Sequence, residues 1–320
     1  MPLRWSAISA RRCAQSRLRL NLAAVSSKHV AKRGQGKEED ADCALDRNGG
    51  FSWQVLLAVY DAVGIRYTCA GSRDCARSCQ ARRQHLFFLT ADYAFGHSLE
   101  QQASEVIRAN GGKVLGAVRH PFATPDLSSF ILQAQTSKAK IIGIASGPPD
   151  NTNAIKLAGE FAVFQGGQQL AGLLVVITDI HALELQAAQG LILTTSFYWD
   201  MDEKTREWSK RFFAKQNRMP TMWQAGVYSS VMNYLKAIEK IGTDEPLKVA
   251  EQMRARPVED FFSRNGRLRS DGLMVHDLVL VQVKKPEESH YPWDYYHVLT
   301  HIPGDQAFGP PDPACPIAKN

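Results

Sequence analysis

The sequence between residues 86 and 200 alternates short apolar runs with stretches of helical spacing. The apolar runs are 86–90, 113–118, 140–145, 173–177 and 190–195, and they are separated by a polar turn or by helical patterns such as 99–109 and 151–162. Strands that alternate with helices predict a parallel, doubly wound sheet with right-handed crossovers. We therefore expect an α/β fold in which a ligand lies beyond the carboxyl ends of the strands.

The rest of the chain predicts further helices and a few short strands. Long helices are expected at 203–216 and 222–241, a short helix at 247–254, short strands joined by turns within 260–283, and a last strand at 295–300. The proline-rich stretch from Pro303 to Pro316 predicts an extended surface segment.

The first quarter of the chain differs in composition from the remainder. Residues 1–85 hold 15 Lys and Arg against 7 Asp and Glu, whereas the later residues hold 23 against 25. Because the whole positive excess lies in the first segment, the net charge of +6 says little about function. No aromatic interleaving or nucleic-acid motif accompanies the basic residues, so we predict no nucleic-acid partner. We expect a basic, poorly ordered segment at 1–85 and a folded domain at 86–320.

Motifs of common cofactor and catalytic sites are missing from the sequence. It has no GxGxxG, no Walker A loop and no HExxH, and the spacing of Cys69, Cys75 and Cys79 is not that of a zinc site. Ser146 lies one position away from the place of the serine in a G-x-S-x-G nucleophile elbow. We therefore predict that the protein is not an enzyme and has no cofactor and no metal.

The loops at the predicted strand ends are unusually polar or aromatic. They span 90–98, 145–152, 177–182 and 196–202, and their aromatic residues include Tyr93, Phe95 and Tyr198. Such residues suit a small-molecule cleft, although packing at a lobe surface explains them too. Asp179 and His181 lie two apart on the third loop, where an acid–base pair and two groups aimed at a solute are equally good explanations.

Four segments of the sequence resemble, in order, the second lobe and following helices of type I periplasmic solute-binding proteins, including the leucine/isoleucine/valine-binding family of ABC transporters. They are FFLTADYAFGHSLEQQASEVIRANGGKVLG, HPFATPDLSSFILQAQTSKAKIIGIAS, GLILTTSFYWDMDEKTREWSKRFFAK and MPTMWQAGVYSSVMNYLKAIEKIGT. The resemblance covers nearly all of 86–320 and makes that part a leucine-binding-protein-like domain. It does not extend into 1–85, where the family has its signal and the opening units of the first lobe. We therefore expect a truncated or frameshifted N-terminus and an incomplete first lobe.

The resemblance implies a two-lobed, hinged binder that holds an amino acid or a related small carboxylate or aromatic acid between its lobes and then docks on an ABC permease. Ligand-binding positions carried over from the family are Tyr93, which covers the ligand, Ala145, Ser146 and Pro148 on the next loop, and Asp179 or His181 where an acid meets an α-amino group. Phe95 and Tyr198 complete the expected site.

Two other functions share the same fold. One is a ligand-sensing domain, and the other is a non-functional remnant of a binding protein. The family implies a periplasmic location, whereas residues 1–36 lack the uninterrupted apolar stretch of a secretory signal, which leaves a cytoplasmic location open.

Overall fold

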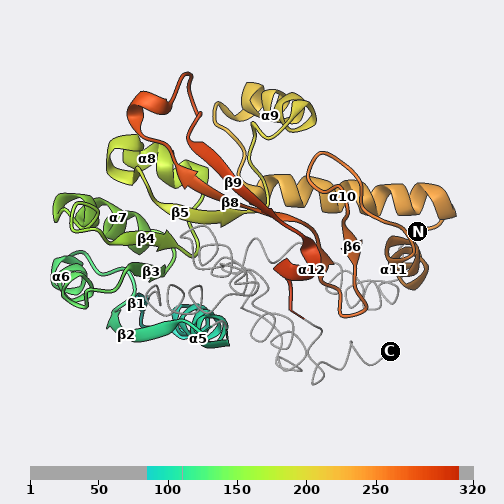
Figure 1. Ribbon diagram of the computed structural model, residues 1–320. Coiled ribbons are helices and arrows are strands. Elements are labelled where there is room, and N and C mark those ends of the chain that lie inside the picture. The colour runs from blue at the N-terminus through green and yellow to red at the C-terminus, as the bar shows by residue number, and fades with distance from the viewer. Residues whose placement is uncertain (1–84, 110, 310–320) are drawn as a thin grey trace, which may run out of the picture. The chain divides into compact units, whose positions relative to one another are not determined.

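The computed structural model describes residues 85–109 and 111–309 (Figure 1). The predictions for the basic N-terminal segment, its cysteines and the tail beyond residue 309 lie outside these residues. The described chain divides into two compact units. One, the sheet unit, holds residues 85–200 and 278–302, and the other, the helical unit, holds residues 201–277 and 303–309.

A seven-stranded sheet in the order β2-β1-β3-β4-β5-β8-β9 forms the centre of the sheet unit. Its strands are β1 (His85–Ala91), β2 (Lys113–His120), β3 (Ile141–Ala145), β4 (Gln169–Gly172), β5 (Ile192–Thr195), β8 (Leu278–Val283) and β9 (Tyr296–Ile302). The first five are parallel to one another, β8 runs antiparallel to β5, and β9 runs antiparallel to β8. The predicted doubly wound α/β fold is confirmed.

Four helices connect the parallel strands of this sheet. They are α5 (Ala94–Ala109), α6 (Ser128–Thr136), α7 (Asp150–Glu160) and α8 (Ile177–Ala188). Because β1 connects to β2 in one direction and the later strands follow in the other, right-handed crossovers place α5 on one face and α6, α7 and α8 on the other. Figure 1 shows α6, α7 and α8 in a row along one side of the sheet. Apolar side chains on the strands, such as Phe88, Ile142 and Ile144, are fully buried between these layers.

Three boundaries differ from the sequence-based expectation. Helix α5 begins at Ala94, so part of the predicted polar turn is its first turn. Strand β4 ends at Gly172, and the apolar run 173–177 that we expected to be a strand leads directly into α8. A continuous apolar run does not distinguish a buried strand from the buried start of a helix, which explains the error. The segment after Pro303 is not extended throughout, because Gly304–Ala307 forms the short helix α12.

The helical unit contains α9 (Glu203–Gln216), α10 (Met222–Ile241), α11 (Pro246–Arg254), the strand pair β6 (Arg267–Leu268) and β7 (Met274–Val275), and α12. The predicted bounds of α9 and α10 are confirmed. Both helices have side-chain caps at their starts, from Asp202 and Thr221, and both end at a residue in the left-handed conformation, Asn217 and Gly242.

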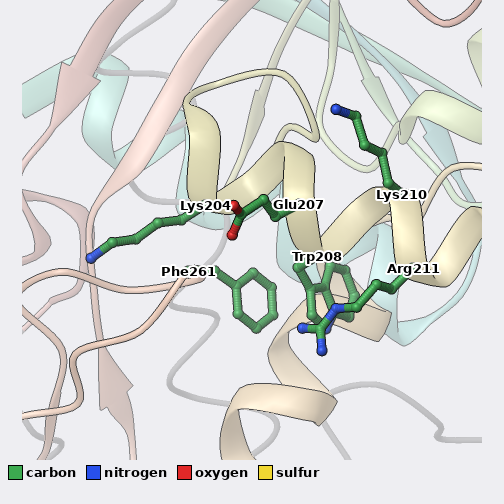
Figure 2. Close-up of a pocket in the computed structure, with 6 residues that line it drawn as sticks. All are labelled: Lys204, Glu207, Trp208, Lys210, Arg211 and Phe261. Carbon is green, nitrogen blue, oxygen red and sulfur yellow. The ribbon is translucent and has the colours of Figure 1, made fainter.

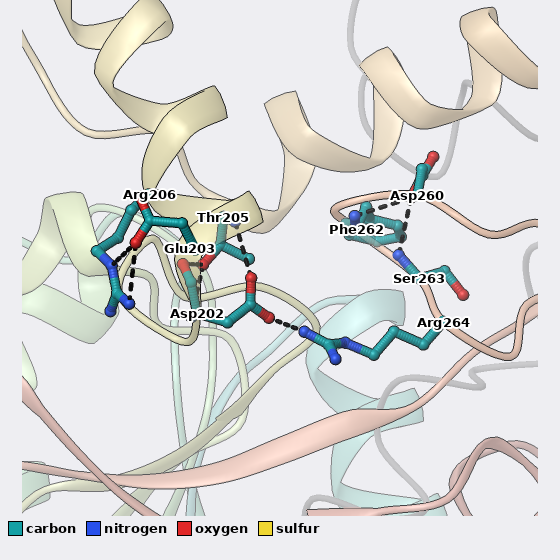
Figure 3. A network of polar contacts seen from close by, with 8 residues as sticks. All are labelled: Asp202, Glu203, Thr205, Arg206, Asp260, Phe262, Ser263 and Arg264. Atoms are coloured by element: carbon teal, nitrogen blue, oxygen red, sulfur yellow. Dashed lines mark hydrogen bonds and ion pairs between the residues drawn. The ribbon is translucent and has the colours of Figure 1, made fainter.

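Polar contacts fix the entry to α9 and the loop at 260–264 (Figure 3). The Asp202 carboxylate accepts a hydrogen bond from the Thr205 amide at 3.0 Å and also pairs with the Arg264 guanidinium. In the same loop, Asp260 Oδ1 accepts hydrogen bonds from the amides of Phe262 and Ser263 at 2.8 and 2.9 Å. Asp202 thus fixes the first turn of α9, and Asp260 fixes the loop at 260–264.

Candidate functional site

The carboxyl ends of β1, β2, β3 and β4 lie along one edge of the sheet, because these strands are parallel and adjacent. Loops and helix N-termini converge at this edge, which is where doubly wound sheets bind ligands. The residues that follow the strands include Tyr93 after β1, Phe122 after β2, Ser146 after β3 and Leu174 after β4. This edge of the sheet unit is the candidate site.

Tyr93 is half-buried and stands at the centre of this edge. Its ring lies 4.9 Å from the ring of Phe122 and 6.0 Å from that of Phe95, whose side chain is exposed. The Tyr93 hydroxyl lies beside Gly147 of the β3 loop, 3.9 Å from the position that a Cβ on Gly147 would occupy. Burial raises the pKa of the Tyr93 hydroxyl, and the nearby Asp150 carboxylate raises it further. The edge thus presents a cluster of three aromatic rings next to a carboxylate.

The loop after β3 supplies a buried polar layer beneath Tyr93. Ala145 and Ser146 are completely buried, whereas Pro148 is exposed and forms a cis peptide bond with the next proline. Asp150, at the first position of α7, is also fully buried, and its Oδ2 accepts a hydrogen bond from the Ala123 amide at 2.9 Å. Of the three residues predicted on this loop, Ala145 and Ser146 are therefore buried behind the edge, and Pro148 is the one exposed to solvent.

His120, at the end of β2, completes this layer. Its side chain is fully buried, and Nδ1 lies 3.9 Å from Asp150 Oδ2 and 3.0 Å from the Pro121 carbonyl oxygen. Within the described residues, His120 Nε2, Asp150 Oδ1 and the Ser146 hydroxyl have no hydrogen-bond partner. All three atoms belong to side chains that are completely buried, so this layer holds polar groups that the described residues do not pair.

The sequence predicts that Asp179 and His181 lie on a loop. In the structure both residues lie in the first turns of α8. Asp179 is partly buried, and its Oδ2 accepts a hydrogen bond from the Val176 amide at 3.0 Å. Burial raises the pKa of Asp179, while hydrogen bonds from the Val176 amide and the Asn151 side chain act in the opposite direction. The aspartate thus caps α8 and contacts the start of α7 at the candidate edge.

His181 is held by the connection between β8 and β9. Its ring stacks on Trp293 at 3.9 Å with an interplanar angle of 14°, and a hydrogen bond of 2.7 Å joins Nδ1 to the Tyr295 hydroxyl. These contacts occupy one face and one nitrogen of the imidazole. The structure therefore groups His181 with this aromatic pair rather than with Tyr93.

The aromatic residues after β5 are buried rather than displayed on a loop. Tyr198 is 4% exposed, and its ring lies 5.0 Å from that of Tyr296. Burial is the main cause of the raised pKa of both tyrosines, and the Asp179 carboxylate adds to the effect at Tyr296. Tyr198 thus packs inside the sheet unit, which is the packing alternative named for these aromatic residues, and its contact with a ligand stays a prediction.

The structure therefore brings Tyr93, Phe95, Ser146 and Pro148 together, with Asp179 beside α7 further along the edge. Sequence reasoning missed the fully buried His120 and Asp150, the exposed Phe122 and the buried Tyr296. For Asp150 a signal existed, since an acidic residue directly after two prolines is typical of a helix N-terminus. Tyr296 gave no signal, because it comes from a strand more than 90 residues beyond Tyr198.

Neither a metal centre nor a membrane span is found in residues 85–109 and 111–309. No group of three or more His, Cys, Asp or Glu side chains is placed to hold a metal ion there. None of the described helices has the length and apolar character needed to cross a bilayer. The arrangement is that of a polar and aromatic surface that can contact a small solute.

The fold and this edge define an α/β protein of the class that binds a small ligand at the carboxyl ends of parallel strands. A family model described as "Periplasmic binding protein" matches residues 76–288, which is well over half of the chain. The chain belongs to the periplasmic binding protein family. This family consists of binding proteins, which confirms both the resemblance stated above and the prediction that the protein is not an enzyme.

Solved structures from two Burkholderia species are similar to this chain. A periplasmic binding protein of Burkholderia mallei is 50% identical with a TM-score of 0.67, over 73% of this chain and 62% of the other. A branched chain amino acid ABC transporter periplasmic ligand-binding protein of Burkholderia xenovorans is 37% identical with a TM-score of 0.70, over 81% and 65% of the two chains.

Among curated proteins, a leucine-, isoleucine-, valine-, threonine-, and alanine-binding protein of Pseudomonas aeruginosa is 31% identical over 104 residues. That match covers 32% of this chain and 26% of the other. The chain thus spans less than two thirds of the length of each of these relatives.

Proposed function

We propose that the protein is the solute-binding component of an ABC importer and that it binds an amino acid, branched-chain-like in its side chain. The observation that carries the proposal is the edge of the sheet unit where half-buried Tyr93 stands over the β3 loop, next to Phe122. The names of the relatives from Burkholderia xenovorans and Pseudomonas aeruginosa support the same class of ligand.

The charges at this edge favour an ammonium group over a carboxylate. The N-termini of α7 and α8 would by themselves attract an anion. Each, however, carries an aspartate in its first turn, Asp150 and Asp179, and the latter accepts the hydrogen bond of the Val176 amide. A negatively charged solute group is therefore repelled here, while an α-ammonium group is attracted. This argues for amino acids over the related small carboxylates and aromatic acids, which remain the alternative ligands.

The aromatic rings at the edge suit the apolar part of such a solute. Phe95 and Phe122 are exposed and flank Tyr93, so an aliphatic side chain would cover apolar surface that is otherwise in water. In this proposal Tyr93, Phe95, Pro148 and Asp179 contact the solute. Ala145, Ser146 and Tyr198 are buried and act by packing rather than by direct contact with the solute. His181 packs against Trp293 and Tyr295 in the connection between β8 and β9.

The wider role follows from the family. We propose a periplasmic location and an ABC permease as the partner, with a basic segment at 1–85 and a leucine-binding-protein-like domain at 86–320. A ligand-sensing domain would bind the same solute without a permease. A remnant would bind no solute.

Calorimetry with leucine, isocaproate and benzoate tests the proposal. Isocaproate has the side chain and carboxylate of leucine but lacks the ammonium group. Loss of a charged hydrogen bond costs roughly 1.5–3 kcal/mol, so we expect isocaproate to bind at least about tenfold more weakly than leucine. Equal or tighter binding of isocaproate or benzoate would contradict the charge argument, and no binding of any of the three would favour the remnant.

Substitution of Asp179 locates the ammonium site. Asp179→Asn retains an oxygen for the Val176 amide, so we expect α8 to stay capped while leucine affinity falls. Lys156→Ala is the matched control, because Lys156 is an exposed residue of α7 whose side chain is 67% accessible. Equal leucine affinity in both variants would remove Asp179 from the site.

A further inference from the structure

The turn after β2, residues 121–124, lies at the surface and yet has a fixed and unusual backbone. Pro121, Phe122 and Ala123 are all exposed, and Ala123 has a positive φ of 57°. Residues with a side chain rarely adopt this left-handed conformation, which persists only where surrounding contacts hold it. The turn therefore needs an anchor outside itself.

The anchor is the carboxylate of Asp150 at the start of α7, 27 residues further along the chain. This side chain is fully buried, and its Oδ2 accepts a hydrogen bond from the Ala123 amide at 2.9 Å. The Pro121 carbonyl oxygen accepts a hydrogen bond from the Thr124 hydroxyl and lies 3.0 Å from Nδ1 of the buried His120. The backbone of the turn is thus fixed both from within and by a different element.

This anchoring positions the side chain of Phe122 at the candidate site. Its ring is 39% exposed, and the ring centre lies 4.9 Å from that of Tyr93. Tyr93 follows the neighbouring strand β1, and its hydroxyl lies beside Gly147, which follows β3. Because β2 comes first in the strand order β2-β1-β3, Phe122 forms the side of the candidate site next to β2.

We propose that Phe122 determines which amino acid side chains the site accepts, and that Asp150 is a positioning residue that holds Phe122 in place through the Ala123 amide. This inference rests on the function proposed above. The Phe122 ring offers apolar surface to a side chain of several carbon atoms and much less to a single methyl group, so it favours leucine over alanine. The ligand class is thereby narrowed to amino acids with large aliphatic side chains.

The ratio of leucine affinity to alanine affinity, measured by calorimetry on the full chain, tests the role of Phe122. Both solutes carry the same ammonium and carboxylate groups, so the ratio reports only the side-chain contact. One buried CH₂ group is worth about fourfold in affinity, so we expect Phe122→Ala to lower the ratio at least about fourfold.

A second aromatic surface, in the helical unit, provides the matched control (Figure 2). A cavity of about 640 Å³ is lined there by Lys204, Glu207, Trp208, Lys210, Arg211 and Phe261. The rings of Trp208 and Phe261 are stacked at 4.3 Å. Three cations against one acid disfavour the ammonium group of an amino acid, so this cavity does not compete for the solute. Phe261→Ala removes the same kind of ring there and should leave the leucine-to-alanine ratio unchanged.

Two variants of Asp150 test the positioning role. Asp150→Ala removes the acceptor of the Ala123 amide, so the ratio should fall as it does in Phe122→Ala. Asp150→Asn retains an oxygen acceptor and should keep most of the ratio, even where loss of the charge weakens both solutes alike. Circular dichroism identifies a variant that fails to fold. Ala123→Val disfavours the same left-handed turn at an exposed side chain, and it carries the test if Asp150→Ala does not fold.

The outcomes separate this inference from the proposed function. An unchanged ratio in Phe122→Ala, with leucine and alanine both bound, would overturn the inference and leave the proposed function standing. A ratio that falls in Phe122→Ala but not in Asp150→Ala or Ala123→Val, or that falls equally in Asp150→Ala and Asp150→Asn, would overturn the positioning role. No binding of either amino acid by the original protein would overturn the inference and the proposed function together.

Discussion

Gly96 lies where the first turn of α5 meets the ends of β1 and β3, next to the candidate site. We expect its replacement by alanine to lower the free energy of unfolding. Gly96 lies in the first turn of α5, three residues after Tyr93, and it is buried against the ends of β1 and β3. A Cβ at this position would overlap the Ala91 carbonyl oxygen and lie 3.0 Å from that of Ala145. Both are backbone atoms of fully buried residues, so neither can give way without movement of the strand ends.

The expected magnitude follows from two opposing effects. Overpacking of a rigid site costs typically 1–3 kcal/mol, while alanine gains up to about 1 kcal/mol over glycine inside a helix. Because the clash is with backbone, the cost lies at the upper end of its range, and we expect Gly96→Ala to lower the free energy of unfolding by about 2 kcal/mol. It should also weaken solute binding, because relief of the clash moves the start of α5 and with it Tyr93.

Gly159→Ala is the matched comparison. Gly159 lies inside α7, and its Cβ would be 3.6 Å from the Ala187 carbonyl oxygen, an ordinary contact. Only the helix-propensity gain applies there, so this variant should be more stable than the original protein by up to about 1 kcal/mol. Urea unfolding followed by circular dichroism measures both. If Gly96→Ala is as stable as Gly159→Ala, the close approach of α5 to the two carbonyl groups is not a constraint and the reasoning fails.

Substitutions at three further positions test the site and the helical unit. Tyr93→Ala should weaken leucine binding in calorimetry with a change in unfolding free energy of no more than about 1–2 kcal/mol, because the ring is only half-buried; unchanged affinity would remove Tyr93 from the site. Burial lowers the pKa of His276, so the unfolded chain binds its proton first and stability should fall as the pH drops below about 6.5. Thermal unfolding should show a smaller acid loss for His276→Phe, and an identical pH profile would contradict this. Asp202→Ala should cost about 1–2 kcal/mol in urea unfolding through loss of the α9 cap, and Asp202→Asn should cost less; equal losses would assign the effect to the Arg264 pair instead.

Helices with their own start and stop signals were predictable from the sequence. For α9 and α10, the polar caps Asp202 and Thr221 and the final Asn217 and Gly242 set both ends, and the structure has the same bounds. The start of α8 was not predictable in this way. The apolar run before Asp179 has the composition of a buried strand, and the structure shows that it enters a helix capped by that aspartate.

Only the part of the candidate site that lies on loops directly after predicted strands could be predicted from the sequence. Tyr93 and the β3 loop occupy strand ends that the alternating pattern locates, and the structure brings them together. The accessibility of Tyr198 was not predictable, because its burial depends on Tyr296, which arrives from the far end of the chain through the register of β9 with β8. Residue type and loop position indicate where a solute can bind, but only tertiary packing decides which side chains are exposed to it.

This distinction determines how the site has to be tested. Asp150 and Asp179 lie at the edge that we propose for the solute, yet each already accepts a hydrogen bond from a backbone amide that holds a loop or a helix start. Replacement by alanine would remove a charge and a structural acceptor together, and a loss of binding would then have two explanations. Asparagine retains an acceptor and removes only the charge. A fall in leucine affinity in Asp179→Asn, with an unfolding free energy near that of the original protein, therefore assigns the effect to the ammonium contact rather than to the fold.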